Sequence, residues 1–168
     1  GAHDMYFVGD FDENGLYQPI QSVGQLSYNS QSYAAQTYYY EPGKPVIRFA
    51  WNRSDIPGAP FNGSMCTPTE MTLKKHGDRY YLSALPIKST ENLVVKSDKL
   101  DDFTLTHCTH ELGSKTCRIS FTVKEGDFTC NLYGLEMKLD KNGLTCGESI
   151  LPRLKNEPMK VDIITDTN

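Results

Sequence analysis

The fold is decided by MYFVGDFD (residues 5–12), followed by SYNSQSYAAQTYYY (27–40), RFAWN (48–52) and FNGSMCTPTEMTL (61–73). These runs are short, rich in aromatic and β-branched residues, and bounded by Gly, Asn, Asp or Pro, which is typical of β-strands joined by turns. Similar runs recur about every ten residues along the chain, and no segment has a persuasive helical period. The sequence therefore predicts an all-β fold.

Each expected strand is a run of Val, Ile, Thr, Tyr or Phe between turn residues. The expected strands are Met5–Gly9, Ser32–Tyr39, Val46–Trp51, Glu70–Lys75, Arg79–Pro86, Asn92–Lys96, Phe103–Cys108, Cys117–Val123, Asp127–Leu132, Glu136–Asp140 and Met159–Thr165. Gly and Asn at the connections indicate hairpin turns, which we predict at Asn14–Gly15, Lys75–Asp78, Glu125–Asp127 and Lys141–Gly143. The one helical candidate is a short turn at Ser89–Leu93.

The segment Arg118–Lys124 shows the expected alternation most clearly. Its residues Ile119, Phe121 and Val123 share one face, and polar residues share the other. This pattern predicts a half-buried antiparallel strand. A domain boundary is expected near residues 86–97, because the chain before it is rich in Tyr with long connections. After the boundary, short strands alternate regularly with turns, as in a β-sandwich.

The overall composition excludes some classes of partner. The 168 residues carry a net charge of −4, so the chain has no basic footprint and we expect no nucleic-acid partner. No apolar run approaches the roughly 18 residues of a membrane span, and we expect no membrane partner. The absence of a secretory signal leaves both a secreted and a cytoplasmic location open. The cysteine count is odd, so at least one thiol is free or pairs outside the chain.

Several segments resemble, in order, the end of the five-bladed propeller of glycoside hydrolase family 32, the β-fructosidases (invertases, levanases and inulinases). Tyr33–Thr37 reads YAAQT, Val46–Asn52 keeps the expected Trp, and Gly63–Leu73 keeps the Pro and Glu of a Pro-Arg-Glu-Leu-Thr-Leu stretch. The chain departs from the family pattern at Ser27, Asn29, Asn52 and Thr69.

The resemblance implies one or more partial propeller blades followed by an antiparallel β-sandwich. Residues 1–88 would be the C-terminal end of the propeller, and residues 92–168 would be the sandwich. The segment Pro158–Asn168 resembles a late sandwich strand. The continuation that follows this strand in the family is not in the sequence, so the sandwich is expected to be truncated.

The resemblance also implies a parent protein that hydrolyses β-fructofuranosyl linkages in sucrose, levan or inulin with retention. Retention needs two carboxylates about 5–5.5 Å apart. The family holds its acidic residues in Asn-Asp-Pro, Arg-Asp-Pro and Glu-Cys motifs, and the chain contains none of them. We therefore assign no catalytic residue, expect the chain alone to be inactive, and expect neither a metal nor an organic cofactor.

The remaining acidic candidates are given structural interpretations. Asp10, Asp12 and Glu13 stand at a strand end and an Asn-Gly turn, which favours solvated turn residues. Glu70 matches a kept family position and is expected to hold the propeller closed through backbone or Arg contacts.

Trp51 is the one candidate substrate-binding residue. The matching family Trp borders the pocket for the fructosyl unit, and an indole face suits the apolar C–H face of a sugar ring. An equally weighted alternative is that Trp51 anchors the core of the blade. Tyr38–Tyr40 would form a similar platform only if they shared a face, and strand alternation separates them. We favour packing for these tyrosines.

The segment from His107 to Cys117 superficially resembles a metal site, because zinc sites use Cys and His at close spacing. However, His107 and Cys108 would point to opposite faces of a strand. A cross-strand disulfide between Cys108 and Cys117, or two ordinary thiols, is the favoured interpretation, and we expect no metal ligands.

Two kinds of partner are expected. One is a fructose-containing carbohydrate. The other is the remainder of the propeller, on another segment or chain, or a second copy of this chain, because an isolated blade exposes sheet edges and an apolar face. The rival hypothesis is a non-catalytic carbohydrate-binding or structural β-sandwich module.

Overall fold

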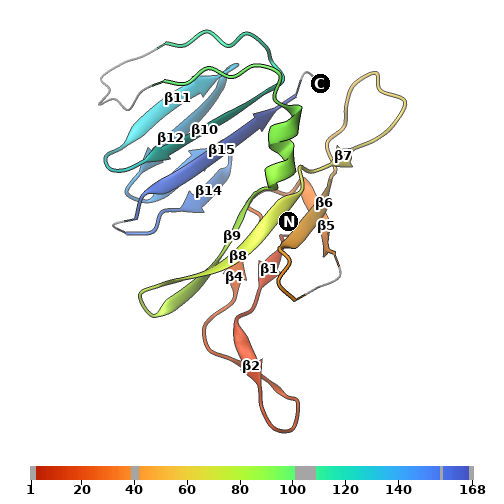
Figure 1. Cartoon of the computed structure of the whole chain (residues 1–168), viewed down its shortest axis with the longest axis vertical. Coiled ribbons are helices and arrows are strands. Elements are labelled where there is room, and N and C mark those ends of the chain that lie inside the picture. Colours follow the sequence, from red (N-terminus) through yellow and green to blue (C-terminus); the bar gives the residue numbers. More distant parts are fainter. Residues whose placement is uncertain (1–2, 39–41, 101–108, 156, 167–168) are drawn as a thin grey trace.

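The computed structural model describes residues 3–38, 42–100, 109–155 and 157–166 of the chain. Fifteen strands and one short 3₁₀-helix lie within these ranges, which confirms the predicted all-β class. Figure 1 shows two regions, one formed by residues 5–86 (red to yellow-green) and one by residues 117–165 (teal to blue). In the described ranges, no helix is long and apolar enough to cross a membrane. The expected strand Phe103–Cys108 lies outside them.

The first region begins with one long hairpin, which extends to the bottom of Figure 1. Its paired strands are β1 (Met5–Tyr6) with β4 (Gly24–Gln25), and β2 (Gly9–Phe11) with β3 (Tyr17–Pro19). The turn at the tip contains Gly15 with a φ of +76°, which confirms the Asn-Gly turn expected there.

The second part of this region is a five-stranded antiparallel sheet. Its strands are β5 (Ser32–Thr37), β6 (Val46–Asn52), β7 (Ser64–Met65), β8 (Thr69–His76) and β9 (Arg79–Pro86). They follow the order β5-β6-β8-β9, with β7 also paired to β6. Gly77 has a φ of +58° in the tight turn between β8 and β9. Apart from the short β7, which pairs with β6 alone, the strands β5, β6, β8 and β9 follow one another in the sheet as a meander.

The 3₁₀-helix η1 (Lys88–Leu93) links the two regions. It confirms the helical turn expected at Ser89–Leu93, but the strand expected at Asn92–Lys96 is wrong. The N–H groups of Thr90 and Val94 donate to the carbonyls of Ile87 and Glu91, so this backbone is committed to the turn. Val94 and Val95 follow in an unpaired, exposed segment.

The C-terminal region consists of two antiparallel sheets that share one core. The first pairs β10 (Cys117–Val123) with β15 (Met159–Thr165). The second has the order β11 (Phe128–Leu132), β12 (Leu135–Asp140), β13 (Gly143–Cys146) and β14 (Ser149–Pro152). The buried residues between the sheets are Leu132, Met137, Leu139, Leu144 and Val161. Ile119, Phe121 and Val123 pack against them, which confirms the face predicted for this strand.

One expected hairpin is wrong. Gly126 does form a turn with a φ of +81°, but β10 pairs with β15 and β11 pairs with β12. The turn therefore carries the chain from one sheet of the core to the other. A local turn signal cannot distinguish these outcomes, because both require the same backbone reversal.

In the described part of the chain, polar contacts join the C-terminal region to the first region and to η1. The Ser149 hydroxyl donates to the Tyr28 carbonyl at 2.7 Å. Arg118 on β10 donates to the Thr90 hydroxyl of η1 at 3.4 Å. His76, at the end of β8, lies 3.3 Å from the Glu157 carboxylate. The Arg118 contact lies between β10 and η1, and the His76 contact joins the end of β8 to the segment just before β15.

Candidate functional site

Trp51 lies near the end of β6, where strands on both sides supply its neighbours. Tyr33 on β5 pairs with it on one side, and Met65 on β7 pairs with it on the other. Directly paired residues of antiparallel strands project from the same face. Tyr33, Trp51 and Met65 therefore form one row across three strands, which we call the aromatic row.

The aromatic row is open to solvent. The exposed fractions are 40% for Tyr33, 41% for Trp51 and 64% for Met65. Large apolar side chains that lie side by side and remain exposed commonly mark a binding surface. Trp51 is therefore not a buried core residue in this structure, although its contact with a substrate remains a prediction.

Arg53 supports one end of the row. Its guanidinium carbon lies 4.5 Å from the centroid of the Tyr33 ring, within the range of a cation–π interaction. Its backbone N–H donates to the Gln31 carbonyl at 2.9 Å, and its guanidinium donates to the Ser30 carbonyl. These contacts hold a cation over one face of Tyr33.

Gly63 closes the row beside Trp51. A Cβ at this position would lie 2.3 Å from the indole Nε1 and 2.5 Å from the Asn52 carbonyl oxygen. The φ of Gly63 is +74°. Any residue with a Cβ would be strained in this conformation. The indole can occupy its position only because residue 63 lacks a side chain.

A β-bulge adjoins the row on β5. The register with β6 shifts between Tyr33 and Gln36, and Ala34 has a φ of +51°. Bulges redirect side chains and are frequent beside active sites, and positive φ at residues other than Gly clusters at functional sites. Because the register shifts at the bulge, the pairing of Tyr33 with Trp51 does not follow from the pairing of Gln36 with Phe49 farther along the strand.

The residues that carry the aromatic row match a known family. The model described as Glycosyl hydrolases family 32 N-terminal domain matches residues 1–84, half of the 168-residue chain. The chain belongs to glycosyl hydrolase family 32. No curated protein and no solved structure was found to match it. The match confirms the family that the resemblance named, and the aromatic row lies inside the matched segment. That the chain is the C-terminal part of such a protein stays a prediction.

The other aromatic candidate in this family 32 chain is only partly described. Tyr38 follows β5 and is 65% exposed, with its ring 4.8 Å from the Phe49 ring in an edge-on contact. Tyr39 and Tyr40 lie outside the described residues. The contact with Phe49 is consistent with the packing role expected for Tyr38.

The acidic candidates Asp12 and Glu70 both lie within the described residues. Asp12 accepts hydrogen bonds from the backbone of Asn14 and Leu16 at 2.9 Å each, as a turn residue does. The hydrogen bond from Leu16 is the main cause that lowers the pKa of Asp12. Glu70 is exposed on β8, and its expected role in holding the propeller closed stays a prediction.

The segment from His107 to Cys117, which superficially resembles a metal site, lies only partly within the described residues. Within the described ranges, no group of three or more His, Cys, Asp or Glu side chains is placed to hold a metal ion. His107 and Cys108 lie outside those ranges. Cys117 is a free thiol, and its Sγ lies 3.2 Å from the Thr165 hydroxyl.

Tyr33, Arg53 and Met65 are members of the candidate site that the sequence did not identify. The bulge, not the strand alternation, sets the position of Tyr33. Arg53 is separated from Tyr33 by most of two strands, so only the fold brings the cation onto the ring. Met65 belongs to the two-residue strand β7, which is too short to recognise from a pattern.

Proposed function

We propose that this family 32 chain is the C-terminal part of a β-fructosidase. Its parent protein would hydrolyse β-fructofuranosyl linkages in sucrose, levan or inulin with retention. The observation that carries this proposal is the exposed aromatic row within the family 32 match. The chain would contribute substrate binding through Trp51, and the catalytic carboxylates would come from the remainder of the protein.

The chemistry of the row suits a sugar. Aromatic faces pack on the apolar C–H faces of sugar rings, and Trp51 and Tyr33 are adjacent on one sheet face. Arg53 lies beside them, and its guanidinium carries five N–H donors that sugar hydroxyls can accept. An uncharged sugar can therefore make both kinds of contact, stacking and hydrogen bonding, with this surface.

The strand arrangement supports a propeller blade in residues 1–88. Strands β5, β6, β8 and β9 form a meander, and a propeller blade is a four-stranded antiparallel sheet. The side-chain amide of Gln21 donates to the Tyr80 carbonyl and accepts from the Tyr80 N–H. This paired contact joins the first hairpin to the outer edge of β9. We assign residues 92–168 to a β-sandwich on the basis of their two packed sheets.

The first region also supports a missing neighbour. Among its described residues, Ala50 is the one buried hydrophobic residue. Outside the aromatic row, the large apolar side chains at least half exposed are Phe7, Phe11, Leu16, Ile20, Tyr38, Phe61 and Leu73. A sheet that buries so little apolar area is not stable alone. We propose that the remainder of the propeller, on another segment or chain, covers this region, with self-association as the alternative.

Binding of inulin and levan to the isolated chain, measured by isothermal titration calorimetry, tests the sugar-binding part. We expect weak binding that Trp51→Ala lowers about five- to tenfold, because stacking is lost. Phe11→Ala removes a more exposed aromatic ring, 72% against 41% for Trp51, from the first hairpin and should leave affinity unchanged. Equal losses in both variants would contradict a role for the aromatic row.

A gel under denaturing conditions, with intact-mass analysis of the native sample, tests the partner. A second, larger polypeptide that carries the Asn-Asp-Pro and Glu-Cys motifs would support the split β-fructosidase. A lone species of 18.9 kDa that binds fructan without hydrolysing it would instead support the rival, a non-catalytic carbohydrate-binding module.

A further inference from the structure

The turn that precedes β5 leads directly into the aromatic row. Asn29 Oδ1 accepts hydrogen bonds from the N–H groups of Gln31 and Ser32, at 3.0 and 2.9 Å, which is how an Asn side chain holds a turn. The next residue, Tyr33, is the first member of the row. Asn29 is also one of the positions at which the chain departs from the family pattern. We call residues 28–32 the entry turn.

Arg53 connects the entry turn to the ring of Tyr33. Its backbone N–H donates to the Gln31 carbonyl at 2.9 Å, and its guanidinium donates to the Ser30 carbonyl. The same guanidinium lies 4.5 Å from the centroid of the Tyr33 ring. Because one side chain makes both contacts, a shift of the entry turn would also move the cation that lies over the ring.

The C-terminal region contacts the entry turn at its first residue. The Ser149 hydroxyl donates to the Tyr28 carbonyl oxygen at 2.7 Å, although 121 positions separate the two residues in the sequence. Ser149 begins β14 and pairs with Cys146 across the turn at Gly147–Glu148. Cys146 in turn packs against the buried cluster. The donor is therefore held in place by the core of the C-terminal region.

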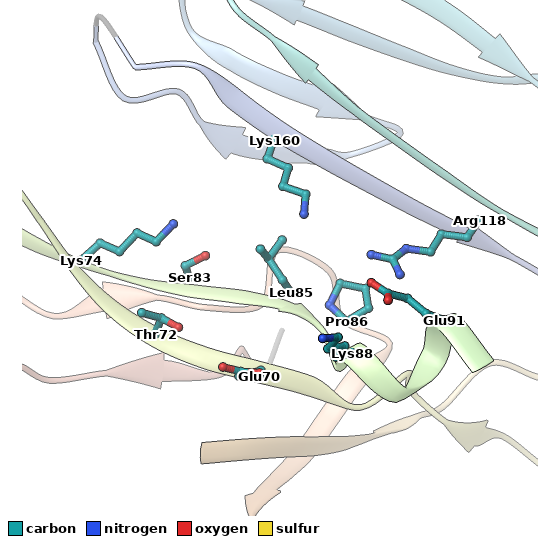
Figure 2. A pocket seen from close by; sticks show the side chains of 10 residues that line it. All are labelled: Glu70, Thr72, Lys74, Ser83, Leu85, Pro86, Lys88, Glu91, Arg118 and Lys160. Atoms are coloured by element: carbon teal, nitrogen blue, oxygen red, sulfur yellow. The ribbon is translucent and has the colours of Figure 1, made fainter. Parts of the chain in front are cut away.

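This contact is separate from the recess between the two regions. Figure 2 shows that recess, whose lining residues belong to β8, β9, η1, β10 and β15. The residues that line it include none from β14 or from the entry turn. Of the polar contacts described above for the C-terminal region, that of Ser149 reaches the segment that leads into β5.

We propose that Ser149 is a positioning residue for sugar binding at the aromatic row. It holds the Tyr28 carbonyl, and the entry turn and Arg53 carry that constraint to the ring of Tyr33. The C-terminal region thus sets the affinity of a surface that it does not line. This inference rests on the proposed function, because the ligand whose affinity changes is the fructan that binds at the row.

Calorimetric titration of the full chain with inulin tests the effect on affinity. We expect Ser149→Ala to weaken binding about two- to fivefold, as for one neutral hydrogen bond, and Ser149→Thr, which keeps the hydroxyl, to restore it. Ser120→Ala removes an exposed hydroxyl from β10 of the same region and should leave affinity unchanged. Unchanged affinity in Ser149→Ala, or an equal loss in Ser120→Ala, would overturn the proposal.

A double-mutant cycle tests whether Ser149 acts through Arg53. Arg53→Gln removes the cation from the Tyr33 ring and its hydrogen bond to the Ser30 carbonyl. Adding Ser149→Ala to Arg53→Gln should therefore weaken inulin binding less than Ser149→Ala does alone, because residues in one contact network are not additive. Fully additive losses would contradict the route through Arg53 and with it the proposal.

Amide chemical shifts of the chain without sugar separate this inference from the proposed function. Ser149→Ala should move the resonances of Gln31, Tyr33 and Arg53, and Ser120→Ala should leave them in place. If they move and the unmodified chain binds no fructan, the proposed function fails while the link between Ser149 and the row is supported. Unmoved resonances of Tyr33 and Arg53 in Ser149→Ala would refute the inference, whatever the affinity for fructan.

Discussion

Gly63 is the residue on which the position of Trp51 depends. In Gly63→Ala, the new Cβ would collide with the indole Nε1 and the Asn52 carbonyl oxygen, at 2.3 and 2.5 Å. The backbone at φ +74° adds strain for any side chain. We expect a loss of about 1–3 kcal/mol in the free energy of unfolding, measured by urea denaturation. The emission of Trp51, the single Trp of the chain, should shift as the indole moves.

Gly58→Ala is the matched control. Gly58 has a φ of +81°, and nothing lies within 4 Å of a Cβ at that position. It therefore carries the backbone strain, about 1–2 kcal/mol, without the collision. Its Trp emission should equal that of the unmodified chain. The same emission shift in both variants would show that Gly63 does not position the indole.

The candidate site could be predicted from the sequence only where one residue carried the signal. Trp51 was identified because it matches a family position. Tyr33 and Met65 could not be added to it, because the row depends on the pairing of three strands. The bulge at Ala34 shifts that pairing, and YAAQT gives no local sign of a left-handed residue, since Ala has no preference for positive φ.

At the scale of elements, the tip of the first hairpin depends on one carboxylate. Asp12 Oδ1 accepts from the N–H groups of Asn14 and Leu16, and Oδ2 accepts from the Gln18 amide. These bonds, that from Leu16 first, lower the pKa of Asp12 in the folded chain. A depressed folded pKa adds stability above the unfolded pKa of about 3.9. That stability is lost as pH falls through the lower, folded pKa.

We therefore expect the hairpin tip to loosen in acid, with lower protection factors (exchange rates corrected for the intrinsic rate at each pH) at the amides of Asn14 and Leu16 below about pH 4. Nuclear magnetic resonance during an acid titration measures this directly. Asp12→Asn keeps an acceptor but removes the charge, so the pH dependence at the tip should disappear. Asp140 holds the β12–β13 turn in the same way, with a pKa lowered mainly by the Asn142 N–H. That turn should keep its pH dependence in the variant, and its loss there would contradict a local effect.

Elements were predictable where alternation and turn chemistry agreed. Arg79–Pro86, Cys117–Val123 and Met159–Thr165 have the expected bounds, because each has a full run of β-prone residues between clear turns. The strands β13 and β14 were missed since four residues give too little alternation to detect. Asn92–Lys96 was overestimated for the opposite reason. Its Leu and Val residues favour a strand, but the Val94 N–H donates to the Glu91 carbonyl of η1 and is not free to pair with another strand.

At the scale of the whole molecule, burial is distributed unequally. The five residues of the buried hydrophobic cluster all belong to the C-terminal region, and Leu139 at its centre is 0% exposed. The first region holds its strands together mainly by backbone pairing and by polar contacts such as that between Arg48 and Asp4. Ladders without a packed apolar face open at low free-energy cost. The two regions should therefore differ in local stability although they form one chain.

Hydrogen exchange followed by mass spectrometry checks this difference. We expect amides of β12 and β13 to exchange at least about tenfold more slowly than those of β5 and β6, because opening them exposes the buried cluster. Leu139→Ala should speed exchange in β12, consistent with a loss of about 2–5 kcal/mol for a buried Leu. Ile150→Ala on β14, where Ile150 is 56% exposed, should have little effect. Addition of the remainder of the propeller should slow β5 and β6 and leave β12 unchanged. Equal protection of both regions in the isolated chain would show that the first region needs no neighbour, and the split β-fructosidase would lose its main physical support.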